Sequence, residues 1–464
     1  MSAGKPICRI VAGRAIALGT LAVSLFCVAA GSPAVAGTDC WTYHPPAAGK
    51  TRGSISWTDS SGFENVINGI VLSDGQIRIY PNSNRNSTTL KNADFSIPVR
   101  DEGGGELAYS PDFLAGKDDT GQAILGYING LTNIIVNANA TRIGNYAFKT
   151  NPNLVRVRLN DGLKSIGTEG FNECEALETV ENFFPDSLEA LGSKAFYGCK
   201  ALAGNMTANG LQSIEARAFR SCQSLRTVDF GNSAVTVFQD YIFFDCPKLG
   251  SAILPETLRT MGIGVFEGCS SLTNVTPLLP PKLETLGTDS NPVFFNDPIQ
   301  GHVVSPPTLA RIGTRAFRAS KIETFTAAKE GLKSIGQYAF FQNYNLTNIV
   351  LSADLESLTA GWVDSFGTAG VEQHIWFRNL PATLPSGLWS NTKTQNIMIH
   401  LPWSQQEAWR EWVASGPTDH VFTFGRQTGR LPERMRDVGT WKAGVTQNVT
   451  WWNDSERRFT ITVR

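Results

Sequence analysis

The side chains that most often carry out chemistry form no catalytic motif in this sequence. Neither H-E-x-x-H nor G-x-S-x-G occurs, so the spacings typical of a zinc protease and of an α/β-hydrolase are missing. Gly49-Lys50-Thr51 resembles the end of a phosphate-binding loop, but His44 stands where the first glycine is required. The five histidines are scattered without ligand spacing: His44, His302, His374, His400 and His420. We expect a protein that is not an enzyme and uses no metal or cofactor; a catalytic site in the terminal regions is the remaining alternative.

Cysteine is the one reactive residue type with a regular spacing. Five of the eight cysteines follow one another at intervals of 23 to 25 residues: Cys174, Cys199, Cys222, Cys246 and Cys269. Asn151, Ser320 and Asn343 take the same place in other units, so the position accepts small side chains suited to bonding with backbone. Parallel Cβ vectors on stacked units give poor disulfide geometry, and no C-x-x-C pair indicates a metal site. We expect buried free thiols; a disulfide or a metal site is the weaker alternative, and the redox state of Cys40 stays open.

Composition and charge exclude several classes of protein. The chain has 464 residues, of which 42% are hydrophobic and 17% charged, with 44 Gly and 23 Pro. It is too apolar for a disordered chain and too rich in Gly and Pro for a coiled coil. Lys and Arg number 40 against 41 Asp and Glu, so no net charge draws the protein to nucleic acid.

Residues 1–36 have the features of a signal peptide. Three basic residues precede the apolar stretch 15–30, and Ala34-Val35-Ala36 supplies small residues before a cleavage site. We expect cleavage near Ala36/Gly37 and a secreted or cell-surface protein with no transmembrane segment after cleavage. An uncleaved anchor is the alternative, although the apolar stretch is short for a bilayer, which needs about 20 residues.

A repeat of 23 to 26 residues governs the middle of the chain. Its units start with a pair such as Ile143-Gly144, followed by a pair such as Ala147-Phe148. The unit starts lie at 143, 166, 191, 214, 238, 261, 286, 312, 335 and 358. Each unit continues with L-x-x-V-x-L, whose alternation predicts a short strand with one buried face. Because such a unit cannot bury its apolar side alone, we expect stacked coils whose strands pair in parallel.

Phenylalanines five residues after the unit starts should form one buried file. They are Phe148, Phe171, Phe196, Phe219, Phe243, Phe266, Phe317 and Phe340. Each buried ring contributes about 1.5–3 kcal/mol through the area it removes from water; a binding role for these rings is the alternative. The unit from 286 to 311 lacks the Ala-Phe pair and contains four prolines, so we expect the array to be irregular there.

The repeat also resembles a known family. The unit L-x-x-I-G-x-x-A-F-x-x-C-x-x-L-x-x-V-x-L, most complete from Leu211 to Phe230, is similar to that of the BspA-like leucine-rich repeat family of bacterial surface and secreted proteins; the likeness covers residues 143–357. It implies a right-handed repeat solenoid of the α/β type with mostly short parallel strands. It further implies a sheet on the concave side, irregular or short helical turns on the convex side, and an adhesin or interaction module rather than an enzyme.

The regions around the repeats differ from it in composition. We expect a β-rich N-terminal module over 37–120, the solenoid over 121–358 with an imperfect first coil, and a Trp-rich C-terminal cap or module of mixed α+β structure over 359–464. The last region holds nine of the 11 Trp, and its pattern predicts a helix over 405–414 and a hairpin within 439–464. Trp supplies large buried area to a capping core, and it also stacks on sugar faces, so a glycan-binding module is the alternative.

Strand residues that alternate with buried ones should project from the concave face. They are Arg156, Arg158, Thr179, Glu181, Thr227, Asp229, Ser251, Asn274, Thr324 and Asn348. This surface is mixed and rich in hydroxyl groups, without an aromatic anchor, and simple solvent exposure competes with a binding role. The segment 286–311, with Phe294 and Phe295, is a second candidate surface. We hypothesise a non-enzymatic adhesion or interaction module for an extracellular protein, with glycan binding through the Trp-rich region as the alternative.

Overall fold

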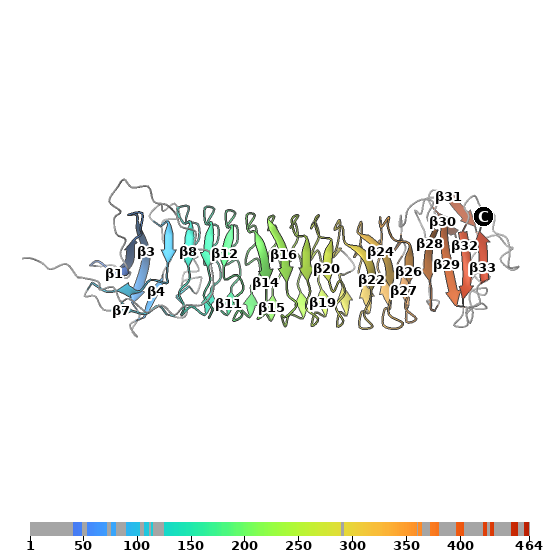
Figure 1. Cartoon of the computed structure of the whole chain (residues 1–464), viewed down its shortest axis with the longest axis horizontal. Coiled ribbons are helices and arrows are strands. Elements are labelled where there is room, and N and C mark those ends of the chain that lie inside the picture. The colour runs from blue at the N-terminus through green and yellow to red at the C-terminus, as the bar shows by residue number, and fades with distance from the viewer. Residues whose placement is uncertain are drawn as a thin grey trace, which may run out of the picture.

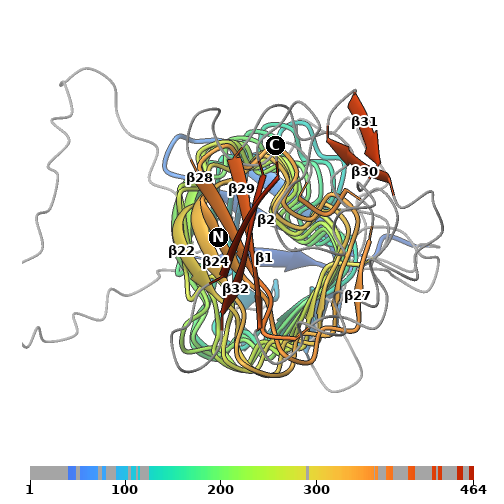
Figure 2. The ribbon, with the colours of Figure 1, turned by 90° about the vertical axis from the view of Figure 1, so that its right-hand side faces the viewer.

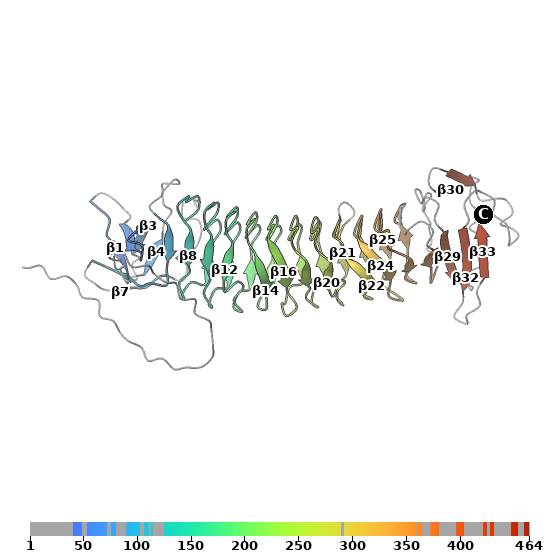
Figure 3. The ribbon, with the colours of Figure 1, turned by 45° about the horizontal axis from the view of Figure 1, so that its top comes forward.

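The chain folds into one long column of stacked coils. The computed structural model describes residues 40–48, 53–71, 76–79, 90–102, 106–110, 113–114, 125–288, 292–359, 361–363, 372–379, 396–402, 421–424, 427–430, 447–452 and 459–463. The column runs almost straight in two views, from an N-terminal sheet to the C-terminal strands (Figures 1 and 3).

One side of the column is built from strands of three to six residues that pair in parallel. Along the chain they are β5 (Asn92–Asp94), β8 (Asn133–Ile135), β10 (Arg156–Arg158), β12 (Thr179–Glu181), β14 (Gly204–Thr207), β16 (Leu225–Asp229), β18 (Ser251–Ile253), β20 (Asn274–Thr276), β22 (Gln300–Val304), β24 (Lys321–Thr326), β26 (Asn348–Val350) and β28 (Glu372–Trp376). Hydrogen bonding divides them into three sections: β5 to β12, β14 to β20, and β22 onward. The alternation predicted from L-x-x-V-x-L is confirmed, since Val157, Val180 and Val228 point inward while their neighbours point outward.

The other side consists of two-residue strands. They are β9 (Arg142–Ile143), β11 (Ser165–Ile166), β13 (Ala190–Leu191), β15 (Ser213–Ile214), β17 (Val237–Phe238), β19 (Thr260–Met261), β21 (Thr285–Leu286), β23 (Arg311–Ile312), β25 (Ser334–Ile335) and β27 (Ser357–Leu358). Each ends on one of the ten unit starts, and that residue is buried. Seen end-on, the long strands β22 and β24 lie on one side of the coil and the short strand β27 on the other (Figure 2).

Turns form the third side of each coil, and the described residues contain no helix. The α/β type and helical turns are therefore not supported. In the regular units the residues three and seven positions after the unit start have positive φ, as at Tyr146 (62°) and Thr150 (55°). Left-handed residues at that interval interrupt an α-helix. The backbone instead bonds to the next coil: Tyr146 N–H donates to Thr168 O and Phe148 N–H to Gly170 O, both at 2.8 Å.

The straightness of the column follows from these turns. Hydrogen bonds join consecutive coils within each section of the long-strand side, within the two sheets of the short-strand side, and through the turns. All three sides therefore rise by the spacing of paired strands, about 4.8 Å per coil. A horseshoe-shaped solenoid needs a wider spacing between coils on one side than on the other. Because the spacing here is equal, the face expected to be concave is a straight strip.

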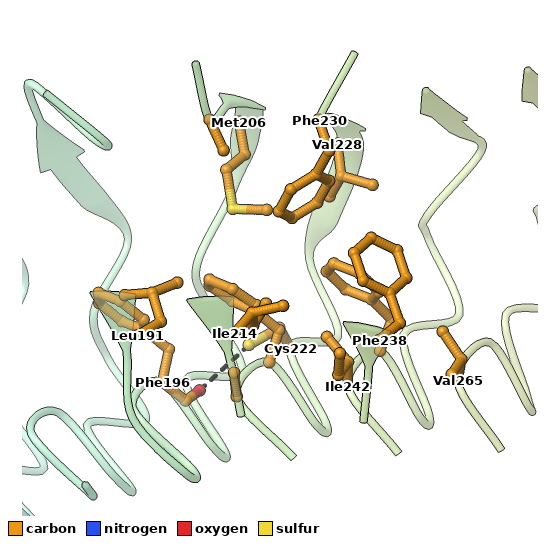
Figure 4. Close-up of a cluster of buried hydrophobic side chains, with 14 of the residues drawn as sticks. Leu191, Phe196, Met206, Ile214, Cys222, Val228, Phe230, Phe238, Ile242 and Val265 are labelled. Carbon is orange, nitrogen blue, oxygen red and sulfur yellow. Dashed lines mark hydrogen bonds between the residues drawn. The ribbon is translucent and has the colours of Figure 1, made fainter. Parts of the chain in front are cut away.

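A stack of phenylalanine rings fills the centre, as the repeat predicted. Ring centroids of Phe196 and Phe219 are 5.4 Å apart with 6° between the planes, and Phe219 and Phe243 follow at 5.6 Å. Figure 4 shows part of this core, with Met206 and Phe230 extending from one strand row toward the other. Trp362 closes the stack, its ring edge-on to Phe340 at 6.2 Å.

The expected irregularity of the unit at 286 is not found in this stack. Phe294 takes the place of the missing ring, with its centroid 5.6 Å from Phe266 and 5.7 Å from Phe317. Phe294 lies eight residues after its unit start rather than five. Strand pairing before and after the unit sets the positions of the coils, so Phe294 reaches the stack although it comes three residues later in its unit.

Sheets cover both ends of the array. The N-terminal sheet has the order β4-β3-β2-β1-β6-β7. Its strands are β1 (Trp41–His44), β2 (Gly53–Thr58), β3 (Glu64–Val71), β4 (Ile77–Ile79), β6 (Val99–Arg100) and β7 (Glu106–Leu107). Between β4 and β6 the chain makes β5, which pairs with β8 and so extends the long-strand side.

The C-terminal strands continue the last section of the long-strand side. They are β29 (Asn396–Pro402), β32 (Gln447–Trp452) and β33 (Phe459–Val463). A separate hairpin is formed by β30 (Val421–Phe424) and β31 (Gln427–Arg430). Antiparallel pairing of β32 with β33 confirms the predicted hairpin. The described part of this region is β structure, which does not support the mixed α+β expectation. The helix predicted over 405–414 and the signal peptide lie outside the described residues, and within those residues we find no helix long and apolar enough to cross a membrane.

Candidate functional site

The outward side chains of the long strands form two parallel rows, which we call the outward strip. Arg156 and Arg158 flank Val157 in β10, and Thr179 and Glu181 flank Val180 in β12; all four are exposed. Arg156 pairs in register with Thr179, Thr227 with Ser251 and Thr324 with Asn348. The residues that the repeat marked as outward-facing therefore line up from strand to strand.

The three sections of the sheet divide these residues into three groups. The first holds Arg156, Arg158, Thr179 and Glu181; the second Thr227, Asp229, Ser251 and Asn274; the third Thr324 and Asn348. The sections meet between β12 and β14 and between β20 and β22. At both junctions the later strand begins with a register shift, at Gly204/Asn205 and at Gly301/His302. The strip is thus not one continuous sheet surface.

Polar contacts between these side chains are local and exposed. Arg156 Nε lies 3.7 Å from Glu181 Oε1, with both side chains about half exposed, and such a pair contributes about 0–1 kcal/mol. Thr227 Oγ1 donates to Asn205 Oδ1 at 2.7 Å, and Asp229 Oδ1 accepts from the Gly231 N–H at 2.8 Å. These contacts all lie at the surface, where a partner can compete for them.

The strip extends further than the sequence predicted, and it has an aromatic anchor after all. His374 and Trp376 lie outward on β28, in register with Asn348 and Val350. Trp376 Nε1 donates to Asn348 Oδ1 at 2.8 Å, and the His374 and Trp376 rings are 6.3 Å apart at 24°. The alternation of His374-Ile375-Trp376 is the sequence signal that could have identified these two residues. It follows the equivalent residues of β26 by 26 positions instead of the usual 23.

An exposed apolar residue lies in the same row as this anchor, three strands away. Val304 on β22 is 64% exposed. In register across the sheet, Val304 pairs with Thr326, Thr326 with Val350, and Val350 with Trp376. His302 Nδ1 lies 3.0 Å from Thr324 Oγ1 in the other row. The third section thus combines aromatic, apolar and hydroxyl groups on one surface.

The second candidate surface is not supported as predicted. Phe294 is fully buried in the ring stack, so it is closed to a partner. Phe295 points the other way and is half-buried. Phe294 has the same role as the phenylalanines of the regular units.

The periodic cysteines are buried free thiols, as expected. Each donates to the backbone carbonyl of the Phe one coil earlier, as Cys222 Sγ does to Phe196 O at 3.2 Å (Figure 4). Burial raises the pKa of Cys174 to about 12, so this thiol is neutral and unreactive at neutral pH. Among the described residues no group of His, Cys, Asp and Glu could hold a metal ion.

Comparison with known proteins gives one family and several solved structures. The family described as "BspA type Leucine rich repeat region" matches in six copies, over residues 121–249, 190–300 and 291–365. A leucine-rich repeat protein from Bacteroides ovatus is 18% identical over 74% of this chain and 95% of its own, with a TM-score of 0.49. The T. pallidum leucine-rich repeat protein is 25% identical over 44% of this chain and 87% of its own, with a TM-score of 0.36. The pneumococcal vaccine antigen PcpA is 14% identical over 84% of this chain and all of its own, with a TM-score of 0.33. A search of curated proteins found no match.

Proposed function

The chain belongs to the BspA-type leucine-rich repeat family, and on that premise we propose that it is a secreted or cell-surface module that binds an extracellular protein without catalysing a reaction. One observation carries this proposal. The outward strip takes no part in the core, yet its third section holds an oriented, half-buried Trp376 and, three strands away in the same row, an exposed Val304. Adhesion through this strip is the corresponding biological role.

The third section has the composition of a binding centre. Trp is among the residues that contribute most at protein interfaces, especially where apolar area surrounds it. The bond from Trp376 Nε1 to Asn348 Oδ1 already restricts the ring, so binding would cost little further side-chain entropy. The first section, with the exposed pair Arg156 and Glu181, fits the polar rim of such an interface.

The test uses the full mature chain as bait for proteins of host and cell-envelope extracts. Trp376→Ala should weaken capture of the bound protein about tenfold or more, since an interface Trp contributes about 2 kcal/mol or more. Tyr344→Ala is the matched control, because Tyr344 is an exposed aromatic residue (54%) on a turn. Circular dichroism would verify that both variants are folded. Equal capture by wild type and Trp376→Ala would refute the proposed surface.

Glycan binding through the Trp-rich region remains a separate hypothesis. Trp362 is fully buried at the end of the ring stack, which favours the capping role for that residue. Trp376 is half-buried on the outward strip. A glycan array probed with the full chain would decide: binding abolished by substitution of Trp residues after 379, and retained by Trp376→Ala, would support a separate glycan site.

A further inference from the structure

The turn side of the column carries a second patterned surface, distinct from the outward strip. In the regular units, residues three and six positions after the unit start lie on it, and several are arginine or aromatic; in the unit at 286 the second place falls to Phe295, nine positions after the start. Phe295, Arg315, Arg318, Tyr338 and Phe341 lie on three consecutive coils, and all five are half-buried. We call these five residues the turn-face cluster.

The arginines of the cluster lie against aromatic rings of adjacent coils. The Arg318 guanidinium carbon is 4.7 Å from the Phe295 ring centroid on the coil before and 5.1 Å from the Phe341 centroid on the coil after. The Arg315 guanidinium is 5.8 Å from the Tyr338 centroid. Stacking of this kind restricts the guanidinium groups without using their outer N–H donors.

No carboxylate of the described residues forms an ion pair with either of these two arginines. Among the ion pairs of the described residues none involves Arg315 or Arg318, and the Nε of each is buried without a hydrogen-bond partner. Burial lowers the pKa of Arg318, and the positive charge of Arg315 lowers it further. Two like charges held together without an acid create a local positive potential that favours a bound anion.

A similar arrangement earlier on the turn side lacks this property. Arg220 lies between Tyr197 and Phe244, with its guanidinium 5.9 Å and 4.4 Å from their centroids. There Glu267 interacts with Arg220. Burial raises the pKa of Glu267, and the positive charge of Arg220 offsets part of that rise. The cluster around Arg315 and Arg318 is therefore the stronger candidate for an anion.

The geometry favours a sugar polymer over a peptide as the anion. A peptide that adds to a fold gains most from backbone hydrogen bonds, but the turn N–H groups here already bond between coils, as Phe317 N–H does to Ala339 O at 2.9 Å. The ring faces are covered by the arginines, but the outward edges of these half-buried rings are apolar surface on which the C–H groups of a sugar can pack. Arginine binds a carboxylate through two parallel hydrogen bonds.

We infer that the turn-face cluster binds an acidic polysaccharide, with Arg315 and Arg318 on the carboxylate of a uronic acid and the outward edges of Phe295, Tyr338 and Phe341 against its sugar rings. The cluster spans three coils in a line along the column, so a linear polymer can contact it without bending. This site is independent of the protein-binding strip proposed above.

The test measures binding of the full chain to polygalacturonate, with dextran as the neutral polymer and poly-L-glutamate as the anionic peptide. Arg315→Gln with Arg318→Gln should weaken polygalacturonate binding about tenfold or more, as expected for loss of charge-assisted hydrogen bonds. Arg156→Gln with Arg158→Gln is the matched control, since it removes two arginines from the outward strip and should leave this binding unchanged. Raising the salt concentration should weaken wild-type binding.

A second measurement avoids substitution altogether. Polygalacturonate should protect Arg315 and Arg318 of the wild-type protein from an arginine-modifying reagent, with the modified residues mapped by mass spectrometry, while Arg156 and Arg158 stay reactive. The inference is overturned by absence of binding, by binding of dextran with equal affinity, or by competition from poly-L-glutamate at equal concentration. It is also overturned if neither arginine is protected. Loss of protein capture in Trp376→Ala with polygalacturonate binding intact would separate the two sites.

Discussion

Asp297 occupies a place in the core where the repeat requires a hydrogen-bond donor. In most other described coils the equivalent side chain donates to the carbonyl of the ring-stack residue one coil earlier, as Cys269 Sγ does to Phe243 O at 3.2 Å and Asn343 Nδ2 to Phe317 O at 2.6 Å. Asp297 is fully buried, and neither carboxylate oxygen has a hydrogen-bond partner. Only the protonated carboxyl can act as the missing donor.

The pH dependence follows from the burial of this group. Desolvation raises the pKa of Asp297 well above its usual value; the Cys269 backbone offsets part of this rise, and the nearby Glu267 adds to it. Because the folded-state pKa is raised, the native state binds the proton more tightly than the unfolded chain. Asp297 therefore stabilises the fold below its unfolded pKa of about 3.9, and that contribution is lost as pH rises toward the folded pKa.

Asp297→Asn should stabilise the protein at pH 7. Asparagine supplies the donor at any pH and already occupies this place at Asn151, whose Nδ2 donates to Leu125 O at 2.7 Å. An unsatisfied buried polar group costs about 1–3 kcal/mol, and more when charged, so we expect a gain of that size. The gain should shrink toward zero below about pH 4, where the wild-type carboxyl is protonated in both states.

Chemical denaturation followed by circular dichroism between pH 4 and pH 8 would measure this gain. Asn343→Asp is the matched control, because it places a carboxyl in the same position two coils later and should destabilise the protein at pH 7. The reasoning fails if Asp297→Asn is less stable than wild type at pH 7. It also fails if the difference in stability is the same at pH 4 and pH 7.

Three further outcomes test the packing of the column. Phe219→Ala should cost about 3–5 kcal/mol in chemical denaturation because it opens a cavity within the ring stack, whereas Phe341→Ala, at a half-buried ring, should cost clearly less. Gly331 has a φ of 106°, and a Cβ added to it would meet the Pro307 carbonyl oxygen, whereas Gly301, with a φ of 92°, has open space at that position. Gly301→Ala should therefore cost only the backbone strain of about 1–2 kcal/mol. In the same assay Gly331→Ala should lower the free energy of unfolding by more. The five periodic thiols should resist a thiol reagent in the native protein and all react in denaturant without reductant; two or fewer reactive thiols would contradict their free state.

Sequence alone determined the features that every coil shares. A strand residue such as Val157 and a ring such as Phe219 recur at one interval because each coil must present the same apolar groups to the coil on either side. A residue that breaks this pattern in one coil disrupts the core packing of the coils on both sides. The repeat therefore predicted the unit starts, the buried rings and thiols, and the outward direction of Arg156 and Asn348.

Tertiary structure decided what depends on contacts between coils. Phe294 reaches the ring stack despite an insertion because strand pairing, not residue count, sets its position. Turns take the place of helices because the turn N–H groups donate to carbonyl oxygens of the next coil. The same hydrogen bonds keep the column straight. Likewise Trp376 joins Asn348, and Arg318 lies between Phe295 and Phe341, only across strand or coil boundaries. Such neighbours are over 20 residues apart along the chain, so only the register of stacking, which hydrogen bonds between coils establish, brings their chemistry together.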